Sequence, residues 1–218
     1  MTAHVIAYLY RRPDLERAAF RRHYETRHAR LAQTLLPPFS HYVRNHVIGS
    51  AGALTPPDCL SEFGYASVAR RRETAEILGS ERALALREDE LRFMDKARNR
   101  ALAVGRWDWP GAPAKNCVEK STKTKYILWL EGGAQNAPQS RLASTLPWIE
   151  AMDRDLASVT FCAAEENPAN DPLSCWLCRS DARIEPEQLW RRYKDNKLPL
   201  LCCATVDEVV GYPPVSAG

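Results

Sequence analysis

One short segment of the chain concentrates residues capable of acid–base chemistry. The segment Phe20–Leu36, FRRHYETRHARLAQTLL, holds His23 and His28 with Tyr24 and Arg27 between them. At about 100° per residue of an α-helix, its apolar residues form one stripe, with Arg27 near the middle, His28 on the shoulder and His23 near the opposite edge. Ionisable groups that face a core must be paired, hydrogen-bonded or turned toward a cavity. The segment therefore predicts a functional cavity beside this helix.

His28 is the first candidate for chemistry, because an imidazole with a pKa near 6.5 can take and return a proton at neutral pH. The competing interpretation is a core histidine whose ring is satisfied by a backbone carbonyl or by nearby tyrosines. His23 and His46 are predicted to assist His28. Tyr24 either packs in the core or positions a phenolic or carbonyl oxygen of a substrate.

A strand with alternating polar residues supplies further candidates. In SHYVRNHVI, the side chains of Tyr42, Arg44 and His46 share one face of the strand, which either lines a pocket or meets another part of the chain. Glu62 on the next predicted strand either has a raised pKa or pairs with an arginine such as Arg44.

Arg27 stays charged at any working pH, so its burial requires a partner. Either it pairs with a carboxylate, with Glu62 and Asp95 as candidates, or it points into the pocket and binds an anionic group of the substrate. Asp95, in DELRFMDKARNR, is otherwise predicted to cap the end of its helix.

No pattern for a metal or a bound cofactor is evident. His23 and His28 are five residues apart, whereas two ligands of one metal on a helix favour a spacing of four. The sequence has no phosphate-binding glycine loop and no nucleophile elbow. Cys175 and Cys178 form a C-x-x-C inside an apolar strand, which sends the two thiols to opposite faces. Buried, inert thiols are therefore expected.

Composition narrows the class of partner. The formal net charge is only +3 over 218 residues, and no basic run is interleaved with aromatics, which argues against nucleic acid. No apolar run reaches the ~20 residues that span a bilayer. Seven cysteines without a secretory signal are typical of reduced thiols in the cytoplasm. A small hydrophobic substrate is the expected partner.

The elements that must position these residues alternate between strand and helix. The predicted order is the β-α-β-β-α-β of a ferredoxin-like unit. Its elements are strand His4–Tyr10, a helix from Asp14 as N-cap to about Leu36, strands Ser40–Ile48 and Cys59–Ser67, a helix Val68–Met94 broken at Gly79-Ser80 with Ser80 as cap, and strand Arg100–Val104.

The second half repeats this order less clearly, so we expect an α+β fold of two tandem ferredoxin-like units. The predicted domains are residues 1–106, a Pro- and Lys-rich linker 107–123, and a degenerate unit 124–218 with helices at Ser140–Leu156 and from Pro186 to about Lys194. One four-stranded sheet leaves a face bare, and the second unit would cover it. This predicts an intramolecular pseudo-dimeric α+β barrel that is a monomer or a weak dimer.

The N-terminal half resembles the EthD family. The resemblance rests on the strand, R-x-P turn and helix of YLYRRPDLERAAFRRHYETRHARL and on the Phe-x-Asp of DELRFMDKARNRALAV, and it covers about Val5–Val104. One departure is Arg30, where the family usually has proline. The resemblance implies the dimeric α+β barrel superfamily, which includes cofactor-independent monooxygenases, lactone isomerases and polyketide cyclases or decarboxylases.

Together these features predict an enzyme that needs no cofactor and moves a proton with His28 on a hydrophobic oxygenated substrate, such as a polyketide-like phenol or an unsaturated lactone. Tyr24, Tyr42 or Arg27 would hold a developing oxyanion. The leading expectation is a lyase or isomerase that isomerises, dehydrates, cyclises or decarboxylates. One alternative is a monooxygenase whose substrate carbanion reacts directly with O₂. Another is a module that binds a small ligand, or serves a stress response, without catalysis.

Overall fold

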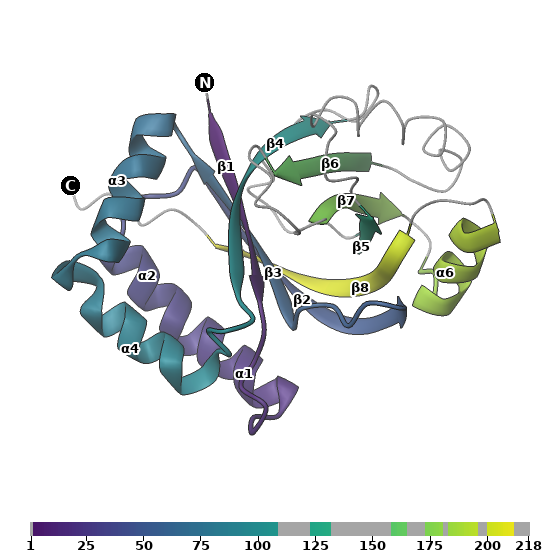
Figure 1. Ribbon diagram of the computed structural model, residues 1–218, viewed down its shortest axis with the longest axis horizontal. Helices are drawn as coiled ribbons and strands as arrows, with labels where there is room; N and C mark the ends of the chain where they lie inside the picture. Colours follow the sequence, from purple (N-terminus) through teal and green to yellow (C-terminus); the bar gives the residue numbers. More distant parts are fainter. Residues whose placement is uncertain are drawn as a thin grey trace. The chain divides into compact units, whose positions relative to one another are not determined.

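The computed structural model describes residues 2–108, 123–131, 158–164, 173–180, 183–195 and 200–211. They have a mixed α/β fold with two compact units (Figure 1). Unit 1 comprises Met1–His46, Pro57–Ala101 and Val209–Gly218, and unit 2 comprises Val47–Pro56 and Leu102–Glu208. The sequence places a single boundary at residue 106. The unit boundaries at residues 46/47, 101/102 and 208/209 each fall within a strand, so three strands, defined below, have residues in both units.

The N-terminal half has the predicted strand and helix order. Its elements are β1 (Ala3–Leu9), α1 (Arg17–His23), the π-helical turn η1 (Tyr24–His28), α2 (Ala29–Leu35), β2 (His41–Gly52), β3 (Cys59–Tyr65), α3 (Val68–Gly79), the 3₁₀ turn η2 (Glu81–Ala83), α4 (Leu84–Phe93) and β4 (Arg100–Asp108). None of the helices in the described part of the chain is long and apolar enough to cross a membrane.

The first helix begins later than the sequence predicts. Asp14 does not cap it, because the guanidinium of Arg12 binds the Asp14 carboxylate at 2.7 and 2.9 Å. The first helical bond instead runs from the amide of Phe20 to the carbonyl of Glu16, and the helix begins at Arg17. The predicted break at Gly79-Ser80 is confirmed.

The predicted cap at that break is wrong. Ser80 donates its hydroxyl back to the carbonyl of Ile77 at 2.8 Å and caps no amide of the following turn. Ser67 is the capping serine, since its Oγ accepts the amide of Arg70 at the start of α3. This cap also explains why β3 ends at Tyr65 rather than at Ser67.

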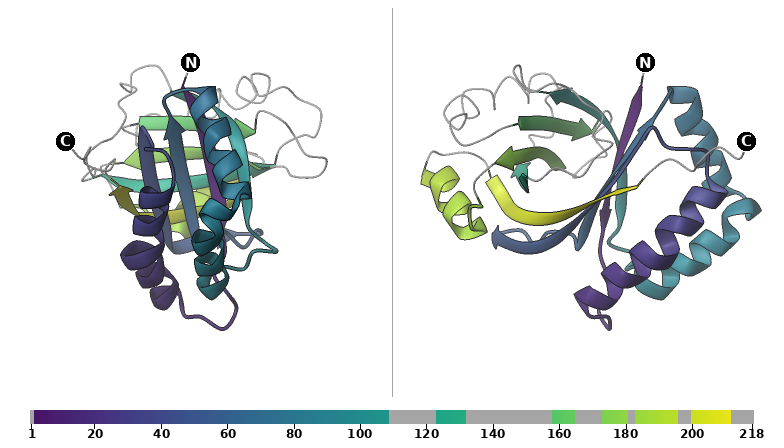
Figure 2. Two further views of the ribbon diagram at one scale, coloured as in Figure 1. Left: turned by 90° about the vertical axis from the view of Figure 1, so that its left-hand side faces the viewer. Right: turned by 180° about the vertical axis from the view of Figure 1, so that it is seen from behind.

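Unit 1 is a sheet covered on one face by helices. Strands β1 and β2 both pair antiparallel with β3, and helices α1 to α4 pack on one face of this sheet, with α2 and α4 side by side (Figures 1 and 2). The core between the layers is largely aromatic, and Phe20, Tyr24 and Phe93 are each at most 1% exposed. Strand alternation therefore decides which side chains of β1, β2 and β3 face the helices.

Unit 2 contains the predicted strands and C-terminal helix of the second half. These are β5 (Thr124–Glu131), β6 (Ser158–Ala164), β7 (Leu173–Ser180), α6 (Pro186–Asp195) and β8 (Leu200–Gly211). Leu189 of α6 packs in one core with Tyr126 and Leu128 of β5. The predicted helix Ser140–Leu156 lies outside the described residues, as does most of the predicted linker. Because β4 continues to Asp108, the first two residues of the predicted linker 107–123 belong to this strand.

The eight strands follow the hydrogen-bonded order β1-β3-β2-β8-β5-β7-β6-β4 of a closed barrel. Within unit 2, β5 pairs antiparallel with both β7 and β8, and β6 pairs with β7. A barrel of mixed α/β character is thus present, while the finer prediction of two tandem ferredoxin-like units stays a prediction.

The close approach of β3 to the start of β2 gives a test of this packing. A Cβ added at Gly64 would lie 2.7 Å from the Cβ of His41 and 3.0 Å from the Oγ of Ser40. We expect Gly64→Ala to lower the free energy of unfolding by about 1–3 kcal/mol, because the strand pair must shift. Urea unfolding monitored by circular dichroism measures this loss.

Gly79→Ala is the matched control, because nothing lies within 4 Å of its added Cβ at the end of α3. Its unfolding free energy should stay the same or rise by up to about 1 kcal/mol. Equal stability of the two variants would contradict the described contact of β3 with the start of β2.

Candidate functional site

Three side chains of the first helix, by which we mean the continuous segment α1, η1 and α2, converge on one buried carboxylate. Asp89 of α4 is only 2% exposed. Its Oδ1 accepts from His23 Nε2 at 3.0 Å and forms an ion pair with Arg27, whose Nε lies 2.8 Å away, and its Oδ2 contacts His28 Nδ1 at 3.1 Å. A buried carboxylate requires partners of this kind, because losing its hydration is costly. The cluster ties the first helix to α4.

The π-helical turn η1 explains why residues five positions apart meet at one point. In a π turn the backbone bonds from i to i+5, so the helix is wider here than an α-helix. His23 and His28 consequently reach the same carboxylate, although a regular α-helix places His23 near the opposite edge from the apolar stripe. The helical-wheel prediction for this segment is wrong for that reason.

Asp89 fixes how the His28 ring can work. A carboxylate only accepts hydrogen bonds, so the neutral ring of His28 must carry its proton on Nδ1, the atom that faces Asp89. Nε2 then carries the lone pair. His28 lines a cavity of about 370 Å³ in unit 1 and packs beside the ring of Tyr24, with 5.3 Å between ring centroids. The ring that carries this basic nitrogen therefore belongs to the cavity wall.

Burial sets the charge of His28. Removal from water lowers its pKa below the ordinary value, and this exceeds the opposing effects of nearby Glu90 and of the hydrogen bond to Asp89. The ring is therefore neutral at pH 7. A neutral imidazole supported by a carboxylate is suited to accept a proton, since the carboxylate stabilises the imidazolium that forms.

Aromatic side chains from the sheet form the opposite wall of the cavity. Tyr42 of β2 and Phe63 of β3 stack at 4.9 Å with ring planes 17° apart, and Phe39 packs against both rings. Tyr65 completes this wall. The volume falls within the range of about 300–1,000 Å³ typical of small-molecule sites. The shape and lining suit a flat hydrophobic molecule.

Two tyrosine hydroxyls lie at this cavity in a buried chain of hydrogen bonds. Tyr42 donates to the hydroxyl of Tyr24 at 3.3 Å, and the Tyr24 hydroxyl lies 2.8 Å from the Oγ of Ser61. Burial raises the pKa of Tyr42 to about 12 and that of Tyr24 well above its ordinary value. Both phenols therefore stay protonated at neutral pH, and each can donate to a substrate oxygen only by giving up its hydrogen bond within this chain.

A second carboxylate, the half-buried Glu25, binds the other polar residues of β2 on its face toward the helices. Arg44 contacts both oxygens of Glu25, at 2.7 and 2.8 Å, and His46 Nε2 lies 2.6 Å from its Oε1. Burial alone would raise the pKa of Glu25, but the hydrogen bonds from His46 and Arg44 outweigh it and the pKa is lowered. The face of β2 that carries Tyr42, Arg44 and His46 thus packs on the helices.

The remaining predicted site residues lie away from the cavity wall. Glu62 is buried on the opposite face of the sheet, where it accepts from Asn45 at 2.8 Å and lies 3.5 Å from His41, so the predicted pairs with Arg44 and Arg27 are wrong. Asp95 accepts the amide of Ala97 in the turn after α4 and does not cap the helix, because the free carbonyls at its C-terminal end need donors and a carboxylate only accepts. Arg27 pairs with neither, because Asp89 is its partner.

Asp89 and Glu25 were missed by reasoning from the sequence, although one signal was available. On α4, Asp89 lies three residues after Leu86 and four before Phe93, and both of those side chains are buried. Asp89 thus occupies an apolar stripe, which in hindsight requires a partner. The sequence gives no comparable signal for Glu25, because it is the π turn that directs its side chain toward β2.

The described cysteines are buried in the core. Cys59, Cys162, Cys175, Cys178, Cys202 and Cys203 are all buried and unbridged. Burial raises the pKa of Cys59 to about 12, which keeps its thiol unreactive. Among the residues that the structure describes, no group of three histidine, cysteine or acidic residues has the geometry of a metal site.

The lowered pKa of His28 predicts how stability depends on pH. The unfolded chain binds a proton at His28 near pH 6.5, whereas the folded protein does so only at lower pH, so the free energy of unfolding should fall as pH drops below about 6.5. The fall ends once the folded ring is also protonated. Urea unfolding at several pH values should show this slope in the wild type and a weaker slope in His28→Gln. Equal slopes would mean that His28 is not desolvated.

The comparisons with known proteins agree with this fold. A crystal structure of an anthrone oxidase-like protein aligns with a TM-score of 0.59 at 8% identity, covering 99% of this chain and 96% of that one. A candidate monooxygenase from Fusobacterium nucleatum aligns with a TM-score of 0.51 at 6% identity, covering 96% and 93%. No curated protein matches the sequence. Residues 12–97 match the family model of the EthD domain, so the resemblance is confirmed over this part of the chain.

Proposed function

We propose that the protein is an enzyme in which His28 removes a proton from a hydrophobic oxygenated substrate held in the cavity of unit 1. One observation carries this proposal: Asp89 holds Nδ1 of a desolvated His28 whose ring lines that cavity. The other predicted bases do not line it. His23 is bound to Asp89 and His46 to Glu25, so both support the cavity wall rather than meet a substrate.

The lining of the cavity indicates the class of substrate. Stacked Tyr42 and Phe63 favour a planar aromatic or conjugated ring system. The neutral hydroxyls of Tyr24 and Tyr42 suit a carbonyl or phenol oxygen, because they can hold the negative charge that moves to this oxygen when a neighbouring C–H or O–H loses its proton. A polyketide-like phenol or ketone fits both features.

Proton removal by His28 leaves a substrate carbanion, and we favour its oxygenation as the next step. The carbanion adds to O₂, the resulting peroxide loses hydroxide after a second C–H proton is removed, and a CH₂ group becomes a carbonyl with release of water. The net change is CH₂ + O₂ → C=O + H₂O, so the substrate itself supplies the electrons. The names of the two similar structures, an anthrone oxidase-like protein and a candidate monooxygenase, support this choice.

A lyase or isomerase reaction is the second candidate, and it shares the first step. The anion held by Tyr24 and Tyr42 could be reprotonated elsewhere, expel hydroxide or close a ring, without O₂. A decarboxylation would instead produce such an anion directly, by loss of CO₂ from a substrate carboxylate. The observation that favours it is the pair of protonated tyrosine hydroxyls at the cavity, which can return a proton as well as hold charge.

We also propose that the two halves are related as tandem ferredoxin-like units. The strand order reads β4-β1-β3-β2 in the first half and β8-β5-β7-β6 in the second, which is the same order of four strands. If one half takes the place of a dimer partner, the protein should be a monomer or a weak dimer in solution.

Substitution of His28 tests the proposed enzyme. We expect His28→Gln to stay folded and to lower turnover by about 10²–10⁴-fold, because a general base is lost. Turnover of anthrone and of hydroxylated anthrones is followed by absorbance, together with O₂ uptake in an oxygen electrode. One O₂ consumed per product supports oxygenation, and product formed without O₂ uptake supports the lyase or isomerase.

His41→Gln is the matched control, since His41 is a buried histidine on the opposite face of the sheet. It should retain turnover close to that of the wild type. A wild-type rate in His28→Gln would place the base elsewhere. Saturable binding of these compounds without any chemical change would identify a binding module instead of an enzyme.

A further inference from the structure

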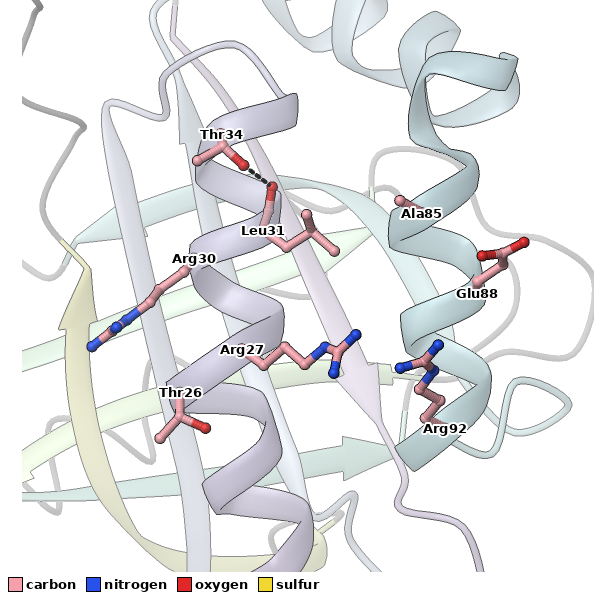
Figure 3. A pocket seen from close by; sticks show the side chains of 8 residues that line it. All are labelled: Thr26, Arg27, Arg30, Leu31, Thr34, Ala85, Glu88 and Arg92. Carbon is pink, nitrogen blue, oxygen red and sulfur yellow. Dashed lines mark hydrogen bonds between the residues drawn. The ribbon is translucent and has the colours of Figure 1, made fainter.

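A second concave site lies outside the cavity, in a groove of about 450 Å³ between α2 and α4 (Figure 3). Its floor includes the apolar side chains of Leu31 and Ala85. Its charged residues are Arg27, Arg30 and Arg92, with Glu88 as the single carboxylate among its lining residues. The groove is therefore basic, and none of its lining residues also lines the cavity of His28.

Arg27 is held in place and only partly used. Its Nε binds the buried carboxylate of Asp89 at 2.8 Å, while 55% of the side chain remains exposed. This ion pair anchors the guanidinium beside Asp89, and no other ion pair or hydrogen bond in the described part of the chain uses its two terminal nitrogens. Figure 3 shows these nitrogens pointing toward the guanidinium of Arg92 on α4.

Arg92 faces Arg27 without a carboxylate between them. Among the described residues, no hydrogen bond or ion pair engages the Arg92 side chain. Glu88 lies one turn earlier on α4, where an ion pair with Arg92 is often formed. In Figure 3, however, the Glu88 carboxylate points away from Arg92, and Arg30 points away from both.

We propose that this groove binds a small oxyanion, a carboxylate or a phosphate, between Arg27 and Arg92. Two guanidinium groups that face each other repel, and an oxyanion between them replaces this repulsion with charge-assisted hydrogen bonds. The orientation of Arg27 is fixed in advance by Asp89, which lowers the entropy lost on binding. Leu31 and Ala85 can contact an apolar group attached to the anion.

The site does not depend on the proposed enzyme activity, because no substrate of the cavity takes part in it. Titration of the whole protein with sodium phosphate and with sodium acetate tests it by calorimetry, at constant ionic strength set by chloride. We expect saturable binding of at least one of the two anions, and the one that binds more tightly defines the ligand class. Chloride added alone should give no comparable heat.

Three substitutions in the groove sharpen the test. Arg92→Gln should weaken binding about tenfold or more, because a charge-assisted hydrogen bond is lost. Arg30→Gln, the matched control, should change the Kd by less than about twofold, as expected for an exposed charge that does not contact the ligand. Glu88→Gln should tighten binding, because the one opposing charge is removed.

Absence of saturable binding of both anions would overturn the proposal. So would an Arg92→Gln variant that binds as the wild type does, or equal losses in Arg92→Gln and Arg30→Gln, which would indicate unspecific attraction to a basic surface. Circular dichroism of each variant confirms that the fold is retained before binding is measured.

Discussion

The pairing of Asp89 with three donors of the first helix is the interaction on which the rest of unit 1 depends. A carboxylate that is 2% exposed is stable only when its charge is balanced nearby, and Arg27 supplies a permanent positive charge. The histidines use the remaining acceptor positions of both oxygens. Because the donors and the carboxylate come from different helices, this cluster fixes α4 against the first helix and thereby one wall of the cavity.

The π turn at Tyr24–His28 is the local feature that makes this pairing possible. It departs from the regular helix at Glu25 itself and at Arg27 and His28, which reach Asp89, in keeping with the frequent occurrence of such turns at functional sites. The same turn directs Tyr24 and His28 to the cavity while Glu25 binds Arg44 and His46 of β2. The buried Asp89 and the half-buried Glu25 therefore secure the same short stretch of helix, one toward α4 and one toward the sheet.

Local patterns predicted the elements of this chain better than they predicted its ion pairs. Alternation in β2 and β3 and the break at Gly79-Ser80 could be seen in the sequence, because period and turn residues act over a few positions. The partner of Arg27 could not, since it depends on the register of α4 against a helix whose own geometry changes at η1. A helical projection that assumes a regular α-helix cannot distinguish Asp89 from Glu62 or Asp95 as the carboxylate partner of Arg27. Asp14 was misplaced as a cap because Arg12, two residues earlier, binds its carboxylate.

The central claim is that Asp89 holds the Nδ1 proton of His28 and so leaves Nε2 as the base at the cavity. Nitrogen NMR of protein labelled with ¹⁵N-histidine reports directly which ring nitrogen carries the proton at pH values where the ring is neutral. The account predicts the Nδ1–H form for His28 in the wild type and a loss of this preference in Asp89→Asn, whose amide can also donate. A wild-type His28 found in the Nε2–H form would contradict it.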